Sequence, residues 1–191
     1  MVYTSTSAYE STTASAKPRD VQVFPIAQDT LMLRSRSWSR LRFEIEYALE
    51  RGTTANAYLI TADKSALLDP PGESFTEIFL TALEQRFDLR TLDYVVLGHI
   101  NPNRIATLKT LLEKAPQITV VCSNPAAIAL RNTLPDTTVR IQVMKGASDE
   151  HLDLGQGHVL DFIPTPTPRY PDSLCTYDPK TQVLFTDKFF G

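Results

Sequence analysis

The stretch Val95-Val96-Leu97-Gly98-His99-Ile100-Asn101-Pro102-Asn103-Arg104 predicts a buried strand that runs into a polar loop. Short apolar, β-branched runs are typical of buried strands, and an α/β sheet presents its chemistry just past the carboxyl ends of such strands. The loop has the spacing of a dinuclear metal loop, but it offers only one imidazole, His99. Two amides, Asn101 and Asn103, stand where such a loop carries carboxylates, and Arg104 stands where it carries a second histidine. Because a guanidinium has no lone pair to donate and keeps its charge, Arg104 repels a metal ion.

Length and composition predict one globular domain. With 191 residues, 42% of them hydrophobic, the chain can bury one sizeable core. A net charge of −3 gives no basic face for nucleic acid or for an anionic membrane. No apolar run is long enough to span a bilayer, and the N-terminus has no signal-peptide pattern, so we expect a cytoplasmic protein without a membrane span.

The domain is expected to occupy residues 18–191, after a disordered tail over residues 1–17. The tail is rich in Ser, Thr and Ala and has too few large aliphatic side chains to offset the entropy of ordering it. Cys122 and Cys175 lie far apart in strand-like surroundings, which predicts buried thiols in a reducing compartment.

Hydrophobic periodicity predicts a mixed α/β fold built on sheets. A helix over residues 75–87 is expected to begin with a capping box formed by Ser74 and Glu77, and a second helix to run over residues 105–114. A third helix is expected to begin with Asn124 as N-cap and Pro125 in its first turn. Residues 41–50 fit a helix or a strand equally well. Strands are predicted over residues 21–26, 30–33, 57–60, 66–68, 94–97, 118–122, 139–143, 159–163, 174–177 and 183–186, with a turn over residues 69–72.

Two further strand ends carry charged residues. The segment from residue 154 to residue 173 predicts a strand followed by a loop in which three prolines fix the backbone ahead of Arg169. The strand over residues 183–186 ends in the carboxylate of Asp187, which Lys188 follows directly.

These three segments, together with residues 34–47, 54–60 and 67–72, resemble the metallo-β-lactamase-like domain of flavodiiron proteins, in the multidomain diflavin form of oxygenic phototrophs. The resemblance implies an αββα sandwich that is truncated before its last strands. It also implies a family that reduces oxygen to water with electrons passed from NAD(P)H through FMN to a diiron site. The FMN domain, the flavin reductase domain and the last histidine ligand are expected beyond Gly191, so the chain is expected to be a fragment or a truncated form.

The resemblance places most of the family's iron ligands on residues that are poor ligands here. In the first loop His99 keeps the leading histidine, whereas Asn101 replaces a Glu, Asn103 an Asp and Arg104 the second His. A guanidinium about 4 Å from a divalent ion costs roughly 8 kcal/mol at an effective dielectric constant near 20. We therefore expect no iron in this segment, and we expect no FMN because the segment contains no Gly-rich phosphate loop.

The other two ligand positions fall on Arg169, where the family has a histidine, and on Asp187. The spacing to the final Phe-Gly would instead put Lys188 at the bridging position. We expect Arg104 or Arg169 to pair with Asp187 in the former metal cavity and to balance its charge in place of the metal.

Each candidate residue also has a structural interpretation. His99 can be a hydrogen-bonded histidine at a strand end, and Asn101 and Asn103 can be turn and cap residues beside Pro102. His151 and His158 have no motif partner and are expected to be surface or ordinary packing residues.

Three functions follow from these patterns. The first is a flavodiiron-type oxygen reductase segment with a degenerate diiron site, inactive alone and acting through a related subunit in a homo- or hetero-oligomer, or in electron transfer. The second is a non-catalytic β-lactamase-like module kept for structure or dimerisation. The third, a metal-dependent hydrolase, is disfavoured by the missing ligands.

Overall fold

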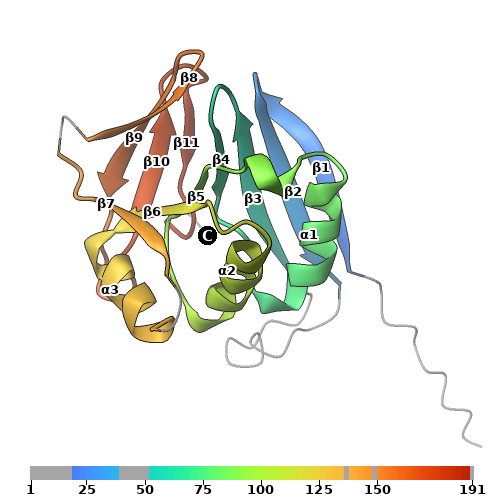
Figure 1. Cartoon of the computed structure of the whole chain (residues 1–191), viewed down its shortest axis with the longest axis horizontal. Coiled ribbons are helices and arrows are strands. Elements are labelled where there is room, and N and C mark those ends of the chain that lie inside the picture. The colour runs from blue at the N-terminus through green and yellow to red at the C-terminus, as the bar shows by residue number, and fades with distance from the viewer. Residues whose placement is uncertain (1–18, 39–51, 136–137, 148–149, 190–191) are drawn as a thin grey trace, which may run out of the picture.

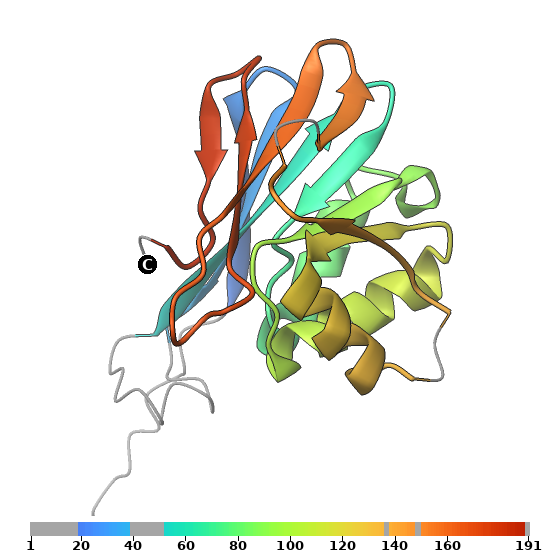
Figure 2. The ribbon, with the colours of Figure 1, turned by 90° about the vertical axis from the view of Figure 1, so that its left-hand side faces the viewer.

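The computed structural model describes residues 19–38, 52–135, 138–147 and 150–189. Within these ranges two β-sheets pack face to face, and three helices cover the outer face of the larger sheet (Figures 1 and 2). The larger sheet has the strand order β1-β2-β3-β4-β5-β6-β7 and the smaller one β11-β10-β9-β8. The elements are β1 (Asp20–Ala27), β2 (Thr30–Ser37), β3 (Thr53–Thr61), β4 (Ser65–Leu68), η2 (Glu73–Phe75), α1 (Thr76–Glu84), η3 (Leu89–Thr91), β5 (Tyr94–Leu97), α2 (Pro102–Lys114), β6 (Thr119–Ser123), α3 (Asn124–Thr133), β7 (Arg140–Met144), β8 (His151–Gly155), β9 (His158–Pro164), β10 (Leu174–Asp178) and β11 (Val183–Phe185).

The pairing of the strands follows from the length of their connections. β1 to β4 form an antiparallel meander joined by short turns, apart from the connection between β2 and β3, which includes residues outside the described ranges. β4 to β7 are parallel, because α1, α2 and α3 each cross over between neighbouring strands. The predicted mixed α/β fold is confirmed.

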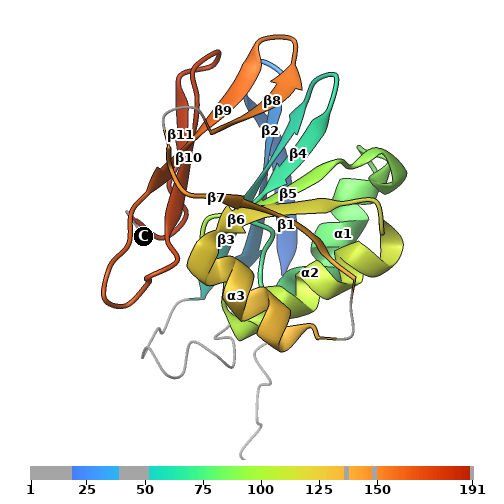
Figure 3. The ribbon, with the colours of Figure 1, turned by 60° about the vertical axis from the view of Figure 1, so that its left-hand side comes forward.

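Two apolar cores hold the layers together. In the central strands successive residues point to opposite faces, so Leu67 and Val95 pack against the helices while Leu68 and Val96 pack against the smaller sheet. Because both faces are covered, these strands read as continuous apolar runs. Within the described residues, helices lie against the larger sheet only, which gives layers α, β and β (Figure 3).

Helix starts differ from those expected. Ser74 lies inside the short helix η2, and no side chain caps η2 or α1, so the capping box was wrong; α1 also ends at Glu84, earlier than expected. α3 is capped by the hydroxyl of Ser123, one residue before the predicted Asn124. η2 runs directly into α1 through Phe75, whereas α3 begins where the extended residue Ser123 ends β6.

Other expectations are settled in part. Cys122 and Cys175 are free thiols buried in the core, as predicted. Residues 1–17 and 41–50 lie outside the described residues. Among the described helices none is long and apolar enough to cross a membrane.

Candidate functional site

Three strand ends meet at one edge of the sandwich. Asp69 follows β4, Gly98 and His99 follow β5, and Asp187 follows β11. The backbone N–H of Leu174 donates to the carbonyl of Gly98 over 2.8 Å, which ties the start of β10 to the end of β5. Because β4 and β5 are parallel, their carboxyl ends lie at the same edge of the larger sheet. The hydrogen bond from Leu174 to Gly98 brings the smaller sheet to this edge as well.

Arg104 occupies the centre of this edge. Its Nη2 donates to Asp187 Oδ1 over 2.5 Å, and its Nη1 donates to the carbonyl of His99 over 3.0 Å and to Asp69 Oδ1 over 3.4 Å. The side chains of Arg104 and Asp187 are only 13% and 4% exposed. One guanidinium therefore bridges β4, β5 and β11, as the predicted pairing of Arg104 with Asp187 requires.

The position of Arg104 is set by the start of α2. The side chain of Asn101 caps this helix by accepting a hydrogen bond from the backbone N–H of Arg104 over 3.0 Å, with Pro102 in the first turn. The side chain of Arg104 thus extends from the first turn of α2 toward the strand ends. The cap interpretation is confirmed for Asn101, whereas Asn103 lies within α2 and packs close to Gly72.

Buried charges perturb one another in this cluster. Burial raises the pKa of Asp69 to about 7, with a further rise from Asp187, and Arg104 and the N–H of Gly98 only partly offset it. For Arg104 burial pushes the pKa down, but the carboxylates of Asp187 and Asp69 outweigh it and raise the pKa above the ordinary value. The cluster thus holds two carboxyl groups, one permanent cation and a proton that Asp69 retains up to about neutral pH.

His99 is held by a carboxylate behind it. Its Nδ1 lies 2.8 Å from Asp172 Oδ1, while Asp172 Oδ2 accepts from the N–H of Ile100 over 2.8 Å. Burial raises the pKa of Asp172, but the His99 ring and the Ile100 N–H outweigh it and hold the pKa below the ordinary value. His99 is therefore the hydrogen-bonded strand-end residue of the structural interpretation, and Tyr170 packs edge-on against its ring.

Arg169 does not share the buried cluster, contrary to expectation. It is exposed, and its guanidinium carbon lies 5.4 Å from the centre of the Tyr170 ring. Lys188 also turns toward this ring, with Nζ 5.9 Å from its centre. Asp187 adopts a left-handed backbone conformation with φ of 44°, so that its carboxylate faces inward while Lys188 faces Tyr170.

Sequence patterns alone do not identify two acidic residues of the site, Asp69 and Asp172. Asp69 falls in the predicted turn over residues 69–72, and Asp172 falls in the predicted loop that precedes residue 174. For Asp69 the signal was present, since it directly follows an apolar strand, as His99 and Asp187 nearly do. For Asp172 the sequence held no such signal, because only the contact between the two sheets brings it to His99.

Because Gly98 has no side chain, Asp187 and Asp69 can pack against its backbone. A Cβ atom there would lie 2.7 Å from Asp187 Cβ and 3.0 Å from the carbonyl oxygen of Leu174. We expect Gly98→Ala to lower the free energy of unfolding by about 2 kcal/mol, because neither neighbour can move without breaking the cluster. Urea unfolding at neutral pH measures this. Gly72→Ala is the matched control, because its new Cβ atom would lie 3.3 Å from Asn103 Cβ. Its free energy of unfolding should fall clearly less than that of Gly98→Ala. Equal losses in the two variants would show that close packing at Gly98 is not the cause.

The comparisons with known proteins fit this architecture. The pattern of the ODP family beta lactamase matches residues 53–191, most of the described chain. The chain belongs to this family. A diflavin flavoprotein A 6 of Nostoc sp. is 65% identical over 178 residues, which are 93% of this chain and 31% of that protein.

Two solved structures superpose well on the chain. A fragment of diflavin flavoprotein A 5 from Nostoc sp. superposes with a TM-score of 0.87 at 64% identity, covering 92% of this chain and 69% of that one. A metal-soaked flavodiiron core from Synechocystis sp. gives 0.86 at 64% identity, covering 92% and 43%. The chain spans about a third of the length of the curated relatives it matches.

Proposed function

We propose that the chain is the ODP beta-lactamase core of a flavodiiron-type subunit in which Arg104 has taken the place of the metal. The relatives are named diflavin flavoproteins, and the whole protein would carry electrons from NAD(P)H through FMN toward oxygen, which is reduced to water. This subunit would act in the cytoplasm, in electron transfer or with a related flavodiiron subunit in a homo- or hetero-oligomer.

The residues at the proposed ligand positions do not fit a diiron centre. The side chain of Asn101 is used as a helix cap, and Arg169 is exposed beside Tyr170. Arg104 already binds Asp187 Oδ1, and Asp187 Oδ2 is buried without a hydrogen-bond partner among the described residues. Within the described residues no group of three or more His, Cys, Asp or Glu side chains is placed to hold a metal ion. No reaction step is therefore assigned to iron in this core.

The single observation that carries the proposal is the guanidinium of Arg104 between Asp69 and Asp187. It supplies positive charge where a metal would, it donates hydrogen bonds in fixed directions, and it cannot change oxidation state. Arg104 would thus keep the strand ends together without taking part in redox chemistry. Asp172 would hold the His99 ring in place from behind, as a positioning residue.

Iron uptake tests the proposal. The unmodified full-length protein, incubated with Fe²⁺ without oxygen and desalted, should retain far less than one iron per chain. Arg104→His alone should not restore binding, because the amides remain and Arg169 still replaces a histidine. The quadruple variant Asn101→Glu, Asn103→Asp, Arg104→His and Arg169→His should take up iron, because these changes restore carboxylates and imidazoles at the proposed positions.

Two outcomes would contradict the assignment of positions. One is stoichiometric iron in the unmodified protein. The other is no iron in the quadruple variant when its circular dichroism and unfolding transition show an intact fold.

The alternative is a non-catalytic module for structure or dimerisation. It is favoured by the same cluster, which ties β4, β5 and β11 together as a structural centre would. Electron transfer separates the two proposals. If the full-length protein is reduced by NAD(P)H and passes electrons to a related subunit, the alternative fails; if its flavin is never reduced, the electron-transfer proposal fails.

A further inference from the structure

One buried oxygen atom of the cluster around Arg104 has no hydrogen-bond partner among the residues that the structure describes. It is Oδ2 of Asp187, whose side chain is only 4% exposed. The other oxygen, Oδ1, accepts from Arg104. A carboxylate oxygen that is buried without a donor is costly, because it loses the hydrogen bonds of water and gains none in return. Asp187 therefore requires a second donor in addition to Arg104.

The buried carboxylate of Asp178 shows the usual arrangement for comparison. Its Oδ2 accepts from the Thr181 hydroxyl over 2.7 Å and lies 2.8 Å from His158 Nδ1, and its Oδ1 accepts from the N–H of Lys180 over 3.2 Å. Both oxygens thus have partners. His158 is accordingly a buried packing residue and His151 an exposed one, as the sequence predicts.

Tyr58 brings a hydroxyl group to the cluster from β3. It pairs across the strands with Leu68, the residue that precedes Asp69. Its ring also packs against Phe185, two residues before Asp187, with 4.9 Å between the ring centres. Burial raises the pKa of the Tyr58 hydroxyl, and the charges of Asp69 and Asp187 add to this rise. The hydroxyl therefore keeps its proton at neutral pH and can donate it in a hydrogen bond.

The contacts of Asn56 determine which bond the Tyr58 hydroxyl can still make. Asn56 Oδ1 accepts from Arg34 Nε over 3.2 Å. The hydrogen bond from Asn56 lowers the pKa of Tyr58, as a donor to the phenol oxygen does. The amide of Asn56 thus donates to Tyr58, which leaves the hydrogen of the hydroxyl for another acceptor. That acceptor is not Asp187 Oδ2, which has no partner within the described chain.

We propose that one buried water molecule bridges the hydroxyl of Tyr58 and Oδ2 of Asp187. A water molecule accepts from Tyr58 and donates to Asp187 with the same oxygen atom, and buried waters typically bond to polar groups that would otherwise lack partners. An ammonium ion has donors only and cannot accept from Tyr58, and Arg104 repels any cation. The inference rests on the proposed replacement of the metal by Arg104, and it gives each oxygen of Asp187 one donor.

Crystals of the full-length protein, grown without alcohols or ammonium, test the inference. We expect one peak of electron density at about 2.5–3.0 Å from both Tyr58 Oη and Asp187 Oδ2. After a soak in rubidium chloride, an anomalous map should show no peak at this position, because rubidium replaces a bound monovalent cation but not a water molecule.

The variant Tyr58→Phe removes the donor and keeps the ring. The density should vanish in this variant, and oxygen-17 relaxation dispersion in solution should count one long-lived water fewer per chain than in the unmodified protein. Tyr177→Phe on β10 is the matched control, because it removes a half-buried hydroxyl elsewhere in the sandwich, and it should change neither measurement. If Tyr58→Phe does not fold, the density of the unmodified protein decides.

The inference is wrong if rubidium gives a peak at this position, if Tyr58 bonds directly to Asp187, or if the density persists in Tyr58→Phe. It is also wrong if the unmodified protein shows Arg104 between Asp69 and Asp187 but no water density, an outcome that leaves the proposed function intact. Two iron peaks at this site, with Arg104 turned away, would instead contradict the proposed function and this inference together.

Discussion

Arg104→Met is expected to lower the free energy of unfolding by about 3–5 kcal/mol at pH 8, the usual result of removing one partner from a buried ion pair. Asp187 would be left 4% exposed, with its nearest cation gone and Asp69 beside it. Urea unfolding at pH 8 measures the loss.

Two further variants show whether charge is the cause. The double variant Arg104→Met with Asp187→Leu should recover part of the stability, because replacing both partners removes the isolated charge. Arg90→Met breaks the exposed pair with Asp88 and should have no measurable effect. If the double variant is no more stable than Arg104→Met, the loss comes from packing rather than from charge.

Asp69 should make the protein more stable as the pH falls from 7 toward 4. Its pKa in the folded protein is about 7, against 3.8 for an ordinary aspartate. The folded state therefore binds the proton more tightly than the unfolded chain, and this contribution is complete below pH 3.8 and lost as the pH rises through 7. A difference of this size corresponds to roughly 4 kcal/mol.

The comparison with Asp69→Asn isolates this contribution. The amide keeps an acceptor for the N–H of Gly98 but carries no proton that titrates. The variant should match or exceed the natural chain in stability at pH 8 and lose its advantage near pH 4. Below that range Asp172 acts in the opposite sense, because its lowered pKa gives stability that is lost as the pH falls. A constant difference between the two proteins from pH 4 to pH 8 would contradict the raised pKa of Asp69.

The central strands of the larger sheet were predictable because their own residues form continuous apolar runs. Leu67, Leu68, Val95 and Val96 form apolar runs that only a sheet covered on both faces can bury. Strand β8 was not predicted, although His151 and Asp153 alternate with leucines as in a half-buried strand, because the alternation covers only five residues. It pairs with β9 across a turn that contains Gly155 and Gly157.

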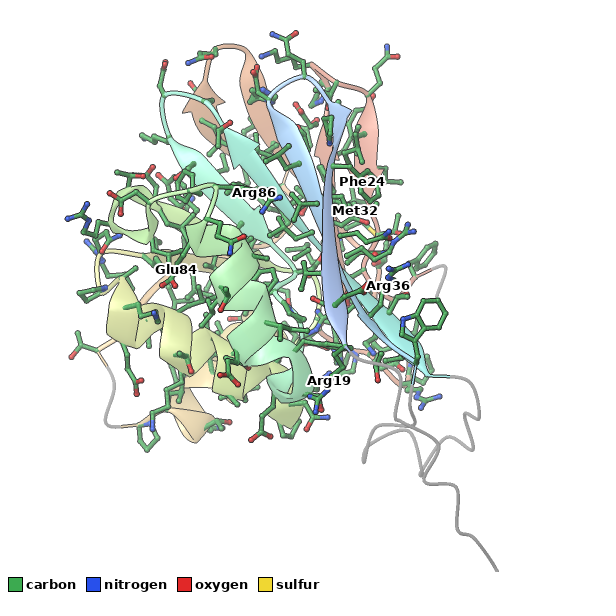
Figure 4. The ribbon with its side chains drawn as sticks, turned by 90° about the vertical axis from the view of Figure 1, so that its right-hand side faces the viewer. Arg19, Phe24, Met32, Arg36, Glu84 and Arg86 are labelled. Atoms are coloured by element: carbon green, nitrogen blue, oxygen red, sulfur yellow. The ribbon has the colours of Figure 1, made fainter. Side chains whose placement is uncertain are left out.

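The sequence predicts the site residues that directly follow a recognisable strand. The pairing of Arg104 with Asp187 was expected because the resemblance places both residues at one former metal cavity, and the ion pair confirms it. The sequence could not exclude Arg169 from the buried cluster, because the spacing of the proline-rich loop does not show that this side chain is exposed beside Tyr170. The hairpin of β1 and β2, on which Phe24, Met32 and Arg36 lie (Figure 4), falls on two predicted strands, over residues 21–26 and 30–33.

The most direct test of the account is an anomalous diffraction map of the full-length protein, crystallised and soaked in Fe²⁺ without oxygen, at the iron absorption edge. We expect no anomalous peak among His99, Asp69 and Asp187, with guanidinium density of Arg104 between the two carboxylates. Two strong peaks at this edge of the sandwich, with Arg104 turned away from Asp187, would contradict the claim that Arg104 stands in place of the metal.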